Sequence, residues 1–169
     1  GRFVVTAKSQ GYDGYFAGFA MALQPDGKIV VAGRFGPGVQ GPNAANRFLV
    51  LRVHADGSAL DAGFGDHGIV TLPMNAYEID NRASAVVVQP DGKIVLAGAE
   101  LEQPDDSDML VLRLLPDGTP DDAFGNHGRR TIGFDFTGMA AGRYDAASTL
   151  VLQPDGKIVA SHDRWVRVG

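Results

Sequence analysis

The chain has 169 residues, of which 44% are apolar and 21% charged, so it can fold as one globular unit and is not a disordered acidic tail. Its net charge of −5 argues against nucleic acids and anionic membranes as partners, and its lack of cysteine excludes disulfide scaffolds and thiol catalysis. No apolar run approaches the roughly 20 residues of a membrane-spanning helix. With 17 Asp, 3 Glu and 23 Gly, the composition favours strands and turns over helices.

The first predicted elements are a short strand and, after it, a segment that occurs three times in the chain. A short apolar run at residues 3–6 is predicted to be a strand, and the repeated segment follows it. LQPDGKIVVAG at Leu23–Gly33 recurs as VQPDGKIVLAG at Val88–Gly98 and as LQPDGKIVAS at Leu152–Ser161. Successive copies are 65 and 64 residues apart, which is the signature of a repeat architecture.

Each copy of this segment is predicted to form a tight hairpin. Proline presets the first central position of the turn, aspartate accepts a local hydrogen bond, and glycine tolerates the left-handed conformation that follows. The turn glycines are therefore expected to be structural: Gly27, Gly92 and Gly156. The runs on both sides of each turn are almost continuously apolar, which predicts strands covered on both faces.

A second motif follows the first two hairpins, as LVLRVHADGSALDAGFGDHG at Leu49–Gly68 and LVLRLLPDGTPDDAFGNHG at Leu110–Gly128. Its arginine recurs in all three repeats and an aspartate follows in two of them: Arg52, Arg113, Arg167, Asp61 and Asp121. We expect a bidentate Arg–Asp clamp that ties a strand to the crossover of its own repeat. The alternative is a ring of cations around an anionic ligand, but recurrence in every repeat favours the structural role.

Two histidines occupy equivalent places near the end of this motif, His67 and His127, and are expected to serve a turn or the packing between repeats rather than a metal. A short strand is predicted directly after each of them. The second repeat is then expected to contain four strands: Ile69–Pro73, Ser84–Val88, Lys93–Gly98 and Met109–Leu115.

Small four-stranded antiparallel sheets, repeated in tandem and covered on both faces, are the blades of a β-propeller. The predicted fold is therefore all-β with about three blades, at residues 1–60, 61–122 and 123–169, the last of them truncated. Three blades do not close a ring, and both end faces would expose apolar sheet. We expect either further blades in a longer chain or self-association of copies into a ring or a filament.

These motifs resemble the bacterial delta-60 repeat. The resemblance rests on LQPDGKIVVAG followed by LVLRV, DGS, LD and FG in order, and it covers essentially the whole chain as three units. It implies a β-propeller of unknown biochemical function in a bacterial protein that is secreted or exposed on the cell surface. It implies no catalytic residues.

The connections between the first and second strands of the blades are the expected place for ligand binding. They vary between repeats, and variable loops on a rigid scaffold commonly carry binding. The candidate residues are Tyr12, Asp13, Tyr15, Arg143, Tyr144 and Asp145. Exposed tyrosine beside aspartate and arginine suits carbohydrate or peptide, and simple packing of these loops is the alternative.

An acidic loop in the second repeat is a weak candidate for calcium, since carboxylate oxygens are its preferred ligands. It contains Asp105, Asp106 and Asp108. The loop lacks the glycine register of an EF-hand and occurs in one repeat, so a solvated loop is the alternative.

The function expected from the sequence is that of a structural or binding module without catalytic residues or cofactor. Its partners would be protein or carbohydrate, or other copies of itself. One alternative is a lectin-like propeller. Another is a hydrolase whose carboxylates converge at the central channel, with Asp13, Asp80 and Asp145 as candidates. Fold alone does not choose among these.

Overall fold

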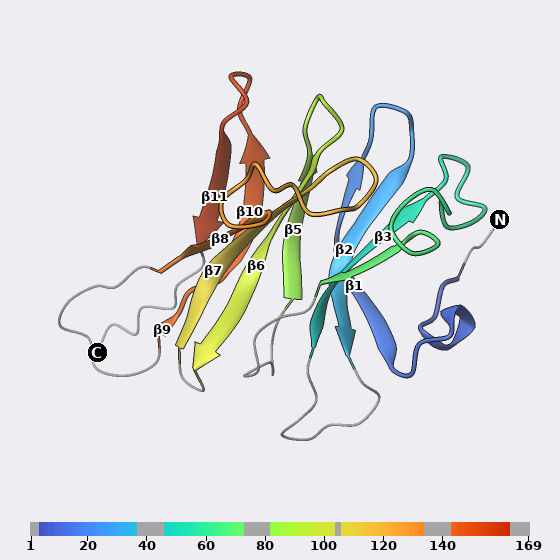
Figure 1. The fold of residues 1–169 in the computed structure, drawn as a ribbon, viewed down its shortest axis with the longest axis horizontal. Helices are drawn as coiled ribbons and strands as arrows, with labels where there is room; N and C mark the ends of the chain where they lie inside the picture. Colours follow the sequence, from blue (N-terminus) through green and yellow to red (C-terminus); the bar gives the residue numbers. More distant parts are fainter. Residues whose placement is uncertain (1–3, 37–45, 73–81, 104–105, 134–142, 163–169) are drawn as a thin grey trace.

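The computed structural model describes residues 4–36, 46–72, 82–103, 106–133 and 143–162. Three antiparallel sheets follow one another along the chain and lie side by side like a fan (Figure 1). The first sheet pairs, in order, β1 (Tyr15–Leu23), β2 (Ile29–Gly36), β3 (Arg47–Val53) and β4 (Ile69–Leu72). The second pairs β5 (Arg82–Val88), β6 (Ile94–Gln103), β7 (Asp106–Leu114) and β8 (Arg129–Ile132). The third contains β10 (Ala147–Leu152) and β11 (Ile158–His162) among the described residues.

Two short elements lie outside this plan. A 3-10 helix, η1 (Lys8–Gln10), precedes the first sheet, and β9 (Arg143–Tyr144) pairs in parallel with the start of β7. The described part of the chain contains no helix with the length and apolar character that crossing a membrane would need.

The structure corrects the expected position of the short strand after each FG motif. Ile69–Leu72 was expected to begin the second repeat, but it pairs with β3 and completes the first sheet. β8 likewise completes the second sheet by pairing with β7. The first sheet therefore extends past residue 60, where the repeat boundary was placed. Residues 4–6, expected to be strand, have no regular secondary structure.

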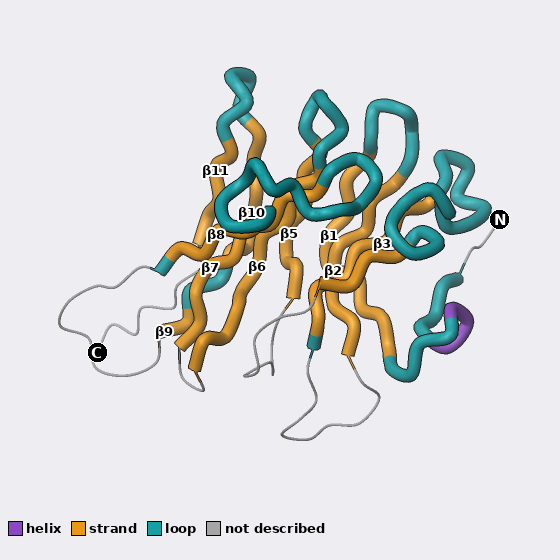
Figure 2. Tube along the Cα trace, in the orientation of Figure 1, coloured by secondary structure: helices purple, strands orange, loops and turns teal. Residues whose placement is uncertain are grey.

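The three hairpin turns have one geometry and project from the same edge of the fan (Figure 2). In each, the glycine N–H donates to the glutamine carbonyl at 2.9 Å and the glutamine N–H donates to the lysine carbonyl at 2.8 Å. The glycines, Gly27, Gly92 and Gly156, have φ values of 84°, 83° and 83°. The aspartate accepts a hydrogen bond from the lysine N–H two residues later, as in Asp26 to Lys28 at 3.1 Å. These are type I turns closed by a glycine in the left-handed region.

Two apolar cores hold the three sheets together. The core between the first and second sheets has fully buried members Val30, Ala32, Phe48, Val50, Phe64, Ala83, Ile94, Leu96 and Leu110. The core between the second and third sheets has smaller side chains: Ala85, Val95, Ala97, Met109, Val111, Ala147 and Leu150. Along β6, Ile94 and Leu96 lie in the first core while Val95 and Ala97 lie in the second. The near-continuous apolar run of β6 is therefore covered on both faces, as expected.

Each sheet packs on the preceding one through its first strand. β5 contacts β1, β2 and β3, and β10 contacts β5 and β6. All three first strands carry an irregularity at one equivalent position, because the ladders skip Phe19, Ser84 and Ser148. A bulge of this kind re-aims a side chain out of the regular alternation.

Candidate functional site

The recurrent arginine and aspartate form an ion pair in each of the first two sheets. Nε of Arg52 lies 2.8 Å from Oδ2 of Asp61, and Nε of Arg113 lies 2.8 Å from Oδ2 of Asp121. The pair uses one carboxylate oxygen rather than the expected bidentate fork, because Oδ1 of Asp61 accepts the Gly63 N–H at 3.1 Å. The equivalent Arg167 lies outside the described residues.

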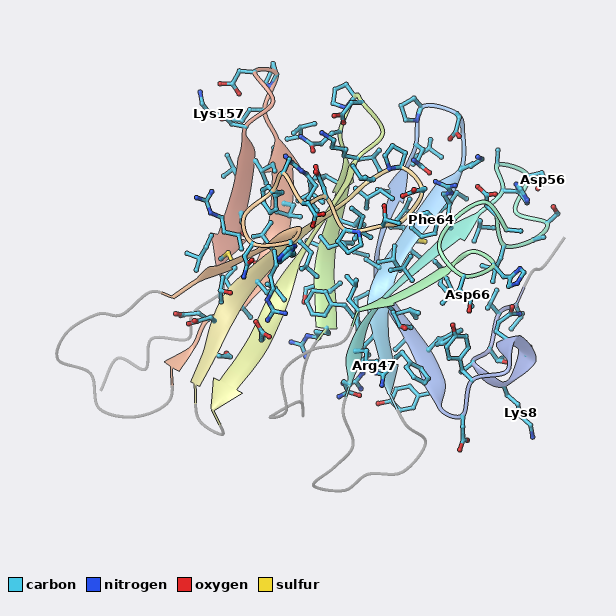
Figure 3. All side chains as sticks on the ribbon, in the orientation of Figure 1. Lys8, Arg47, Asp56, Phe64, Asp66 and Lys157 are labelled. Atoms are coloured by element: carbon cyan, nitrogen blue, oxygen red, sulfur yellow. The ribbon has the colours of Figure 1, made fainter. Side chains whose placement is uncertain are left out.

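The clamp has members that the sequence analysis missed. Nζ of Lys28 lies 3.1 Å from Oδ2 of Asp61, so the lysine of the hairpin turn shares the same carboxylate. The Arg52 guanidinium also stacks over the ring of Phe64, 4.5 Å from its centroid. Phe64 lies at the junction of the first two sheets (Figure 3). The lysine recurs in all three turn motifs, and that recurrence was the available signal.

The clamp also joins neighbouring sheets. Nη1 of Arg52 donates to the Pro116 carbonyl of the second sheet's DG turn, and the Gly65 N–H donates to the Asp117 carbonyl at 2.8 Å. The Arg52 side chain is 8% exposed, so its charge is committed to these internal partners. A buried guanidinium engaged in this way has a structural role, and the arginines of the described repeats do not form a ring open to an anion.

The clamp changes the ionisation of its carboxylate. Burial disfavours the charged form of Asp61, but hydrogen bonds from Lys28 and the Gly63 N–H, with the charge of Arg52, outweigh it and lower the pKa to about 2. The pKa of Asp121 is lowered for similar reasons: burial opposes ionisation, and the Ala123 N–H and Arg113 favour it more strongly.

The first group of predicted ligand residues separates into different environments. The Tyr12 ring packs against Phe16 and Phe35, with centroids 5.6 and 5.4 Å away. Burial, together with the charge of Asp66 and a hydrogen bond to it, raises the pKa of the Tyr12 hydroxyl. Tyr12 therefore covers the outer face of the first sheet, where it belongs to the cluster of Leu49, Leu51 and Ile69. Asp13 is exposed in the connection that leads to β1.

Tyr15 belongs to an exposed patch of two rings and one arginine. The Arg34 guanidinium lies 5.5 Å from the Tyr15 centroid and 5.8 Å from the Phe19 centroid. Tyr15 is 41% exposed and Phe19, the bulge residue of β1, is 49% exposed. A Cβ at position 36 would clash with the Tyr15 ring and with the buried Asn46, so glycine at this position leaves room for the ring. We call Tyr15, Phe19 and Arg34 the aromatic patch.

The second group of predicted ligand residues is not an open loop. Arg143 and Tyr144 form β9, which extends the second sheet beside the start of β7. The Asp145 N–H donates to the Ser107 carbonyl at 2.7 Å, and Asp145 is only 3% exposed. The expectation of an exposed acidic ligand at Asp145 is therefore wrong, because the chain uses this segment to lengthen a sheet edge.

The acidic segment considered for calcium is largely strand. Asp106 and Asp108 lie in β7, with the ladder pairing Glu100 to Asp108, and Asp105 lies outside the described residues. A hydrogen-bonded strand does not fold back around an ion as a chelating loop does. Within the described ranges, acidic and histidine side chains do not gather in groups of three or more that could hold a metal.

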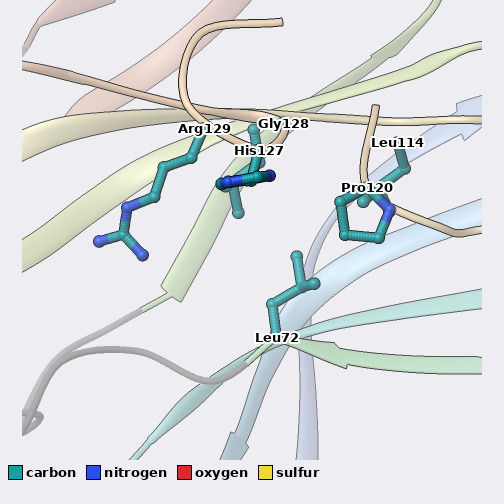
Figure 4. A pocket seen from close by; sticks show the side chains of 7 residues that line it. Leu72, Leu114, Pro120, His127, Gly128 and Arg129 are labelled. Carbon is teal, nitrogen blue, oxygen red and sulfur yellow. The ribbon is translucent and has the colours of Figure 1, made fainter. Parts of the chain in front are cut away.

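The two equivalent histidines are exposed turn residues. His67 and His127 have positive φ values of 50° and 48°, and Nδ1 of His127 lies 3.0 Å from the Asp122 carboxylate. Their side chains are 86% and 84% exposed, as expected for residues of a turn. His127 lines a pocket of about 100 Å³ together with Leu72, Pro120 and Arg129 (Figure 4). Arg129 also forms an ion pair with Glu100, whose side chain is fully buried.

A larger pocket of about 380 Å³ lies between the second and third sheets. Met109, Val111 and Phe124 line it from one side, and Lys157 and Ile158 from the other. At the equivalent place between the first two sheets, three leucines of β7 belong to the first core: Leu110, Leu112 and Leu114. The pocket thus corresponds to a core position of the repeat and is not a separately built ligand site.

Comparison with known proteins identifies one similar family. The sequence model of a β-propeller domain of unknown function, DUF5122, matches residues 24–64 and 89–124. The matched segments run from the hairpin glutamine to the FG phenylalanine in the first and second repeats. No curated protein and no solved structure matches the chain. The family similarity and the four-stranded antiparallel sheets together confirm the predicted fold class, an all-β array of β-propeller blades.

Proposed function

We propose that the chain is a non-enzymatic binding module on a β-propeller scaffold and that its ligand is carbohydrate. The aromatic patch carries the proposal, because two partly exposed rings flank one guanidinium. Flat rings offer apolar faces to the C–H side of a sugar, and the guanidinium offers hydrogen-bond donors to its hydroxyls. Cation–π contact with both rings holds the arginine in place, and both rings stay partly exposed.

The proposal places the module in a bacterial protein of the delta-60 repeat type, secreted or displayed on the cell surface. This part is supported by the repeat motifs alone. Glycans are abundant in that environment, which agrees with a carbohydrate ligand.

The proposal includes neither catalysis nor a cofactor. A hydrolase would need the carboxylates of Asp13, Asp80 and Asp145 to converge on one substrate. Asp13 is exposed next to the first sheet, whereas Asp145 is buried beside β7 of the second sheet. Asp80 lies outside the described residues. These positions do not favour a shared site.

A glycan array followed by calorimetric titration tests the proposal. We expect a subset of glycans to bind, and the replacements Tyr15→Ala and Phe19→Ala to weaken binding by at least about tenfold each through lost apolar burial. Met21→Ala is the matched control, because Met21 is also on β1 and is 73% exposed but pairs across from Val31, outside the patch. Binding of no glycan, or an equal loss with Met21→Ala, would overturn the proposal.

A further inference from the structure

The dipeptide Asp-Gly occurs six times in the chain, each time within the described residues. Such a step can rearrange in water without a catalyst, because the glycine nitrogen can attack Cγ of the aspartate and close a succinimide ring. Glycine has no Cβ to hinder this attack. The surrounding structure therefore decides which of the six steps reaches the reactive geometry.

Five of the six steps lie in tight turns that hold both reacting groups. In each of them, the glycine N–H donates to the carbonyl three residues earlier at 2.9 Å. The aspartate Oδ1 accepts the N–H of the residue two positions later, at 2.9–3.2 Å. The aspartates held in this way are Asp26, Asp56, Asp91, Asp117 and Asp155. Ring closure in these turns would have to break both hydrogen bonds.

The sixth step, Asp13–Gly14, has neither of these restraints. Asp13 is exposed in the bend that leads to β1. Among the residues that the structure describes, its carboxylate has no hydrogen-bond donor and the Gly14 N–H has no acceptor. The two groups that must meet are thus not held apart by the hydrogen bonds that protect the five turns.

We propose that Asp13–Gly14 is a site of spontaneous covalent modification at which Asp13 becomes isoaspartate. The Gly14 nitrogen forms a bond to Cγ of Asp13, and the carboxyl hydroxyl leaves with the amide proton as water. Water then adds to the main-chain carbonyl carbon of Asp13 and breaks its bond to nitrogen, so that the chain continues through Cγ. The product has the original mass, and neither an oxidant nor a reductant takes part.

The modification lengthens the backbone by one methylene between two anchored residues. Tyr12 packs against the aromatic rings of the first sheet, and Tyr15 pairs with Gly36 in the ladder between β1 and β2. We therefore expect isoaspartate at residue 13 to loosen the start of β1, where the aromatic patch begins. The proposal does not depend on carbohydrate binding.

Incubation of the folded chain in neutral buffer tests the proposal. Proteolysis and mass spectrometry with cleavage of the N–Cα bonds then locate isoaspartate at each of the six steps. We expect it to accumulate at residue 13 at least about tenfold faster than at any turn aspartate, the factor that corresponds to one hydrogen bond to a charged group.

Asp13→Glu is the matched variant, because glutamate keeps the charge but cannot close the same ring, and it should abolish the product at this position. Replacement of Gly14 is less suitable, since a Cβ there would clash with the Gly36 carbonyl. The isoaspartate form of the original chain, separated by chromatography, should exchange the Tyr15 amide hydrogen faster than the unmodified form. Equal exchange in the two forms would overturn the expected effect on β1.

The same incubation in guanidinium chloride is the control for the fold. All six steps should then react at similar rates, because the turns that protect five of them are lost. The proposal is overturned if residue 13 of the folded chain reacts no faster than the turn aspartates. It is also overturned if the excess at residue 13 is unchanged in guanidinium chloride, because the local sequence rather than the fold would then set the rate.

Discussion

At the scale of single residues, the buried charge of Asp61 explains why the hairpin turn, the third strand and the crossover share one aspartate. Arg52 and Lys28 both contact Oδ2 of Asp61, at 2.8 and 3.1 Å. A buried carboxylate with two cations and a backbone donor is fully compensated, whereas removal of one partner leaves an unpaired charge. The clamp therefore couples three segments of one repeat, and Arg52 extends the coupling to the Pro116 carbonyl of the next sheet.

The lowered pKa of Asp61 predicts how acid weakens the fold. Its pKa is about 2 in the folded chain against 3.8 ordinarily, so its stabilisation is fully present above about pH 4 and is lost as the pH falls through about 2. We expect Asp61→Asn to lower the free energy of unfolding at neutral pH by about 2–3 kcal/mol, the value of hydrogen bonds to a charged group.

Urea unfolding across this pH range provides the measurement. The original chain should lose stability more steeply than Asp61→Asn, so that the two curves converge in acid. Asp121 keeps its own lowered pKa in both proteins and cancels in the comparison. Parallel curves would show that Asp61 titrates normally.

At the scale of secondary structure elements, the DG turn after the third strand of the second sheet contacts the first repeat. Gly118 has φ +94°, and a Cβ there would lie 2.8 Å from Cγ2 of Val70 in β4 and 2.9 Å from Cε2 of Phe64 in the segment between β3 and β4. Gly57 is its equivalent in the first sheet, with φ +68°, and a Cβ there meets nothing within 4 Å. The same turn is therefore packed in one repeat and open in the other.

Replacement by alanine should therefore lower the free energy of unfolding by different amounts at these two glycines. Gly57→Ala should lower the free energy of unfolding by about 1–2 kcal/mol, because alanine is strained in the left-handed backbone conformation. Gly118→Ala should cost about 1–3 kcal/mol more, because its methyl group overpacks the core against Phe64 and Val70. Chemical denaturation of both variants measures the difference, and equal losses would contradict the close packing of the DG turn on the first sheet.

Much of the fold could be predicted because its signals are local. The Pro-Asp-Gly sequence determines the hairpin turn by the conformational preferences of each residue, and Gly27, Gly92 and Gly156 have the expected φ values. The arginine and aspartate likewise recur, nine residues apart in the first repeat and eight in the second. The strand with which Ile69–Leu72 pairs was not predictable in this way. A short apolar strand has the same sequence pattern whether it ends one sheet or begins the next.

The residues of the candidate site were harder to predict than the turns, because their environments depend on tertiary contacts rather than on local sequence. Tyr12 and Tyr15 are three residues apart and look alike in the sequence, yet one packs on Phe16 and Phe35 while the other is exposed beside Arg34. The difference arises from the approach of the segment to the sheet, which no local pattern encodes. Phe19 was missed because its place depends on a bulge, and the burial of Asp145 depends on the pairing of β9 with β7.

At the scale of the whole molecule, the two apolar cores differ in the size of the side chains that they bury. Among the described residues, the first contains large side chains that are fully buried, including Phe48, Phe64 and Leu96. The second is built largely from alanine and valine, and Leu150 is its main contribution from β10. In a repeat array, stability is set by each unit and its contacts with neighbours, so we expect β10 and β11 to be held less firmly than the strands of the first two sheets.

This difference predicts a gradient of amide hydrogen exchange along the chain. We expect β10 and β11 to exchange through local opening at a lower free energy than β2, β3, β6 and β7, because a hairpin with few large buried side chains opens before the remainder unfolds. Mass-spectrometric exchange of dilute protein measures it, with β5 as the internal reference that contacts both neighbours. Uniform protection of all strands in dilute solution would instead mean that the three sheets unfold as one cooperative unit, with the small second core as effective as the first.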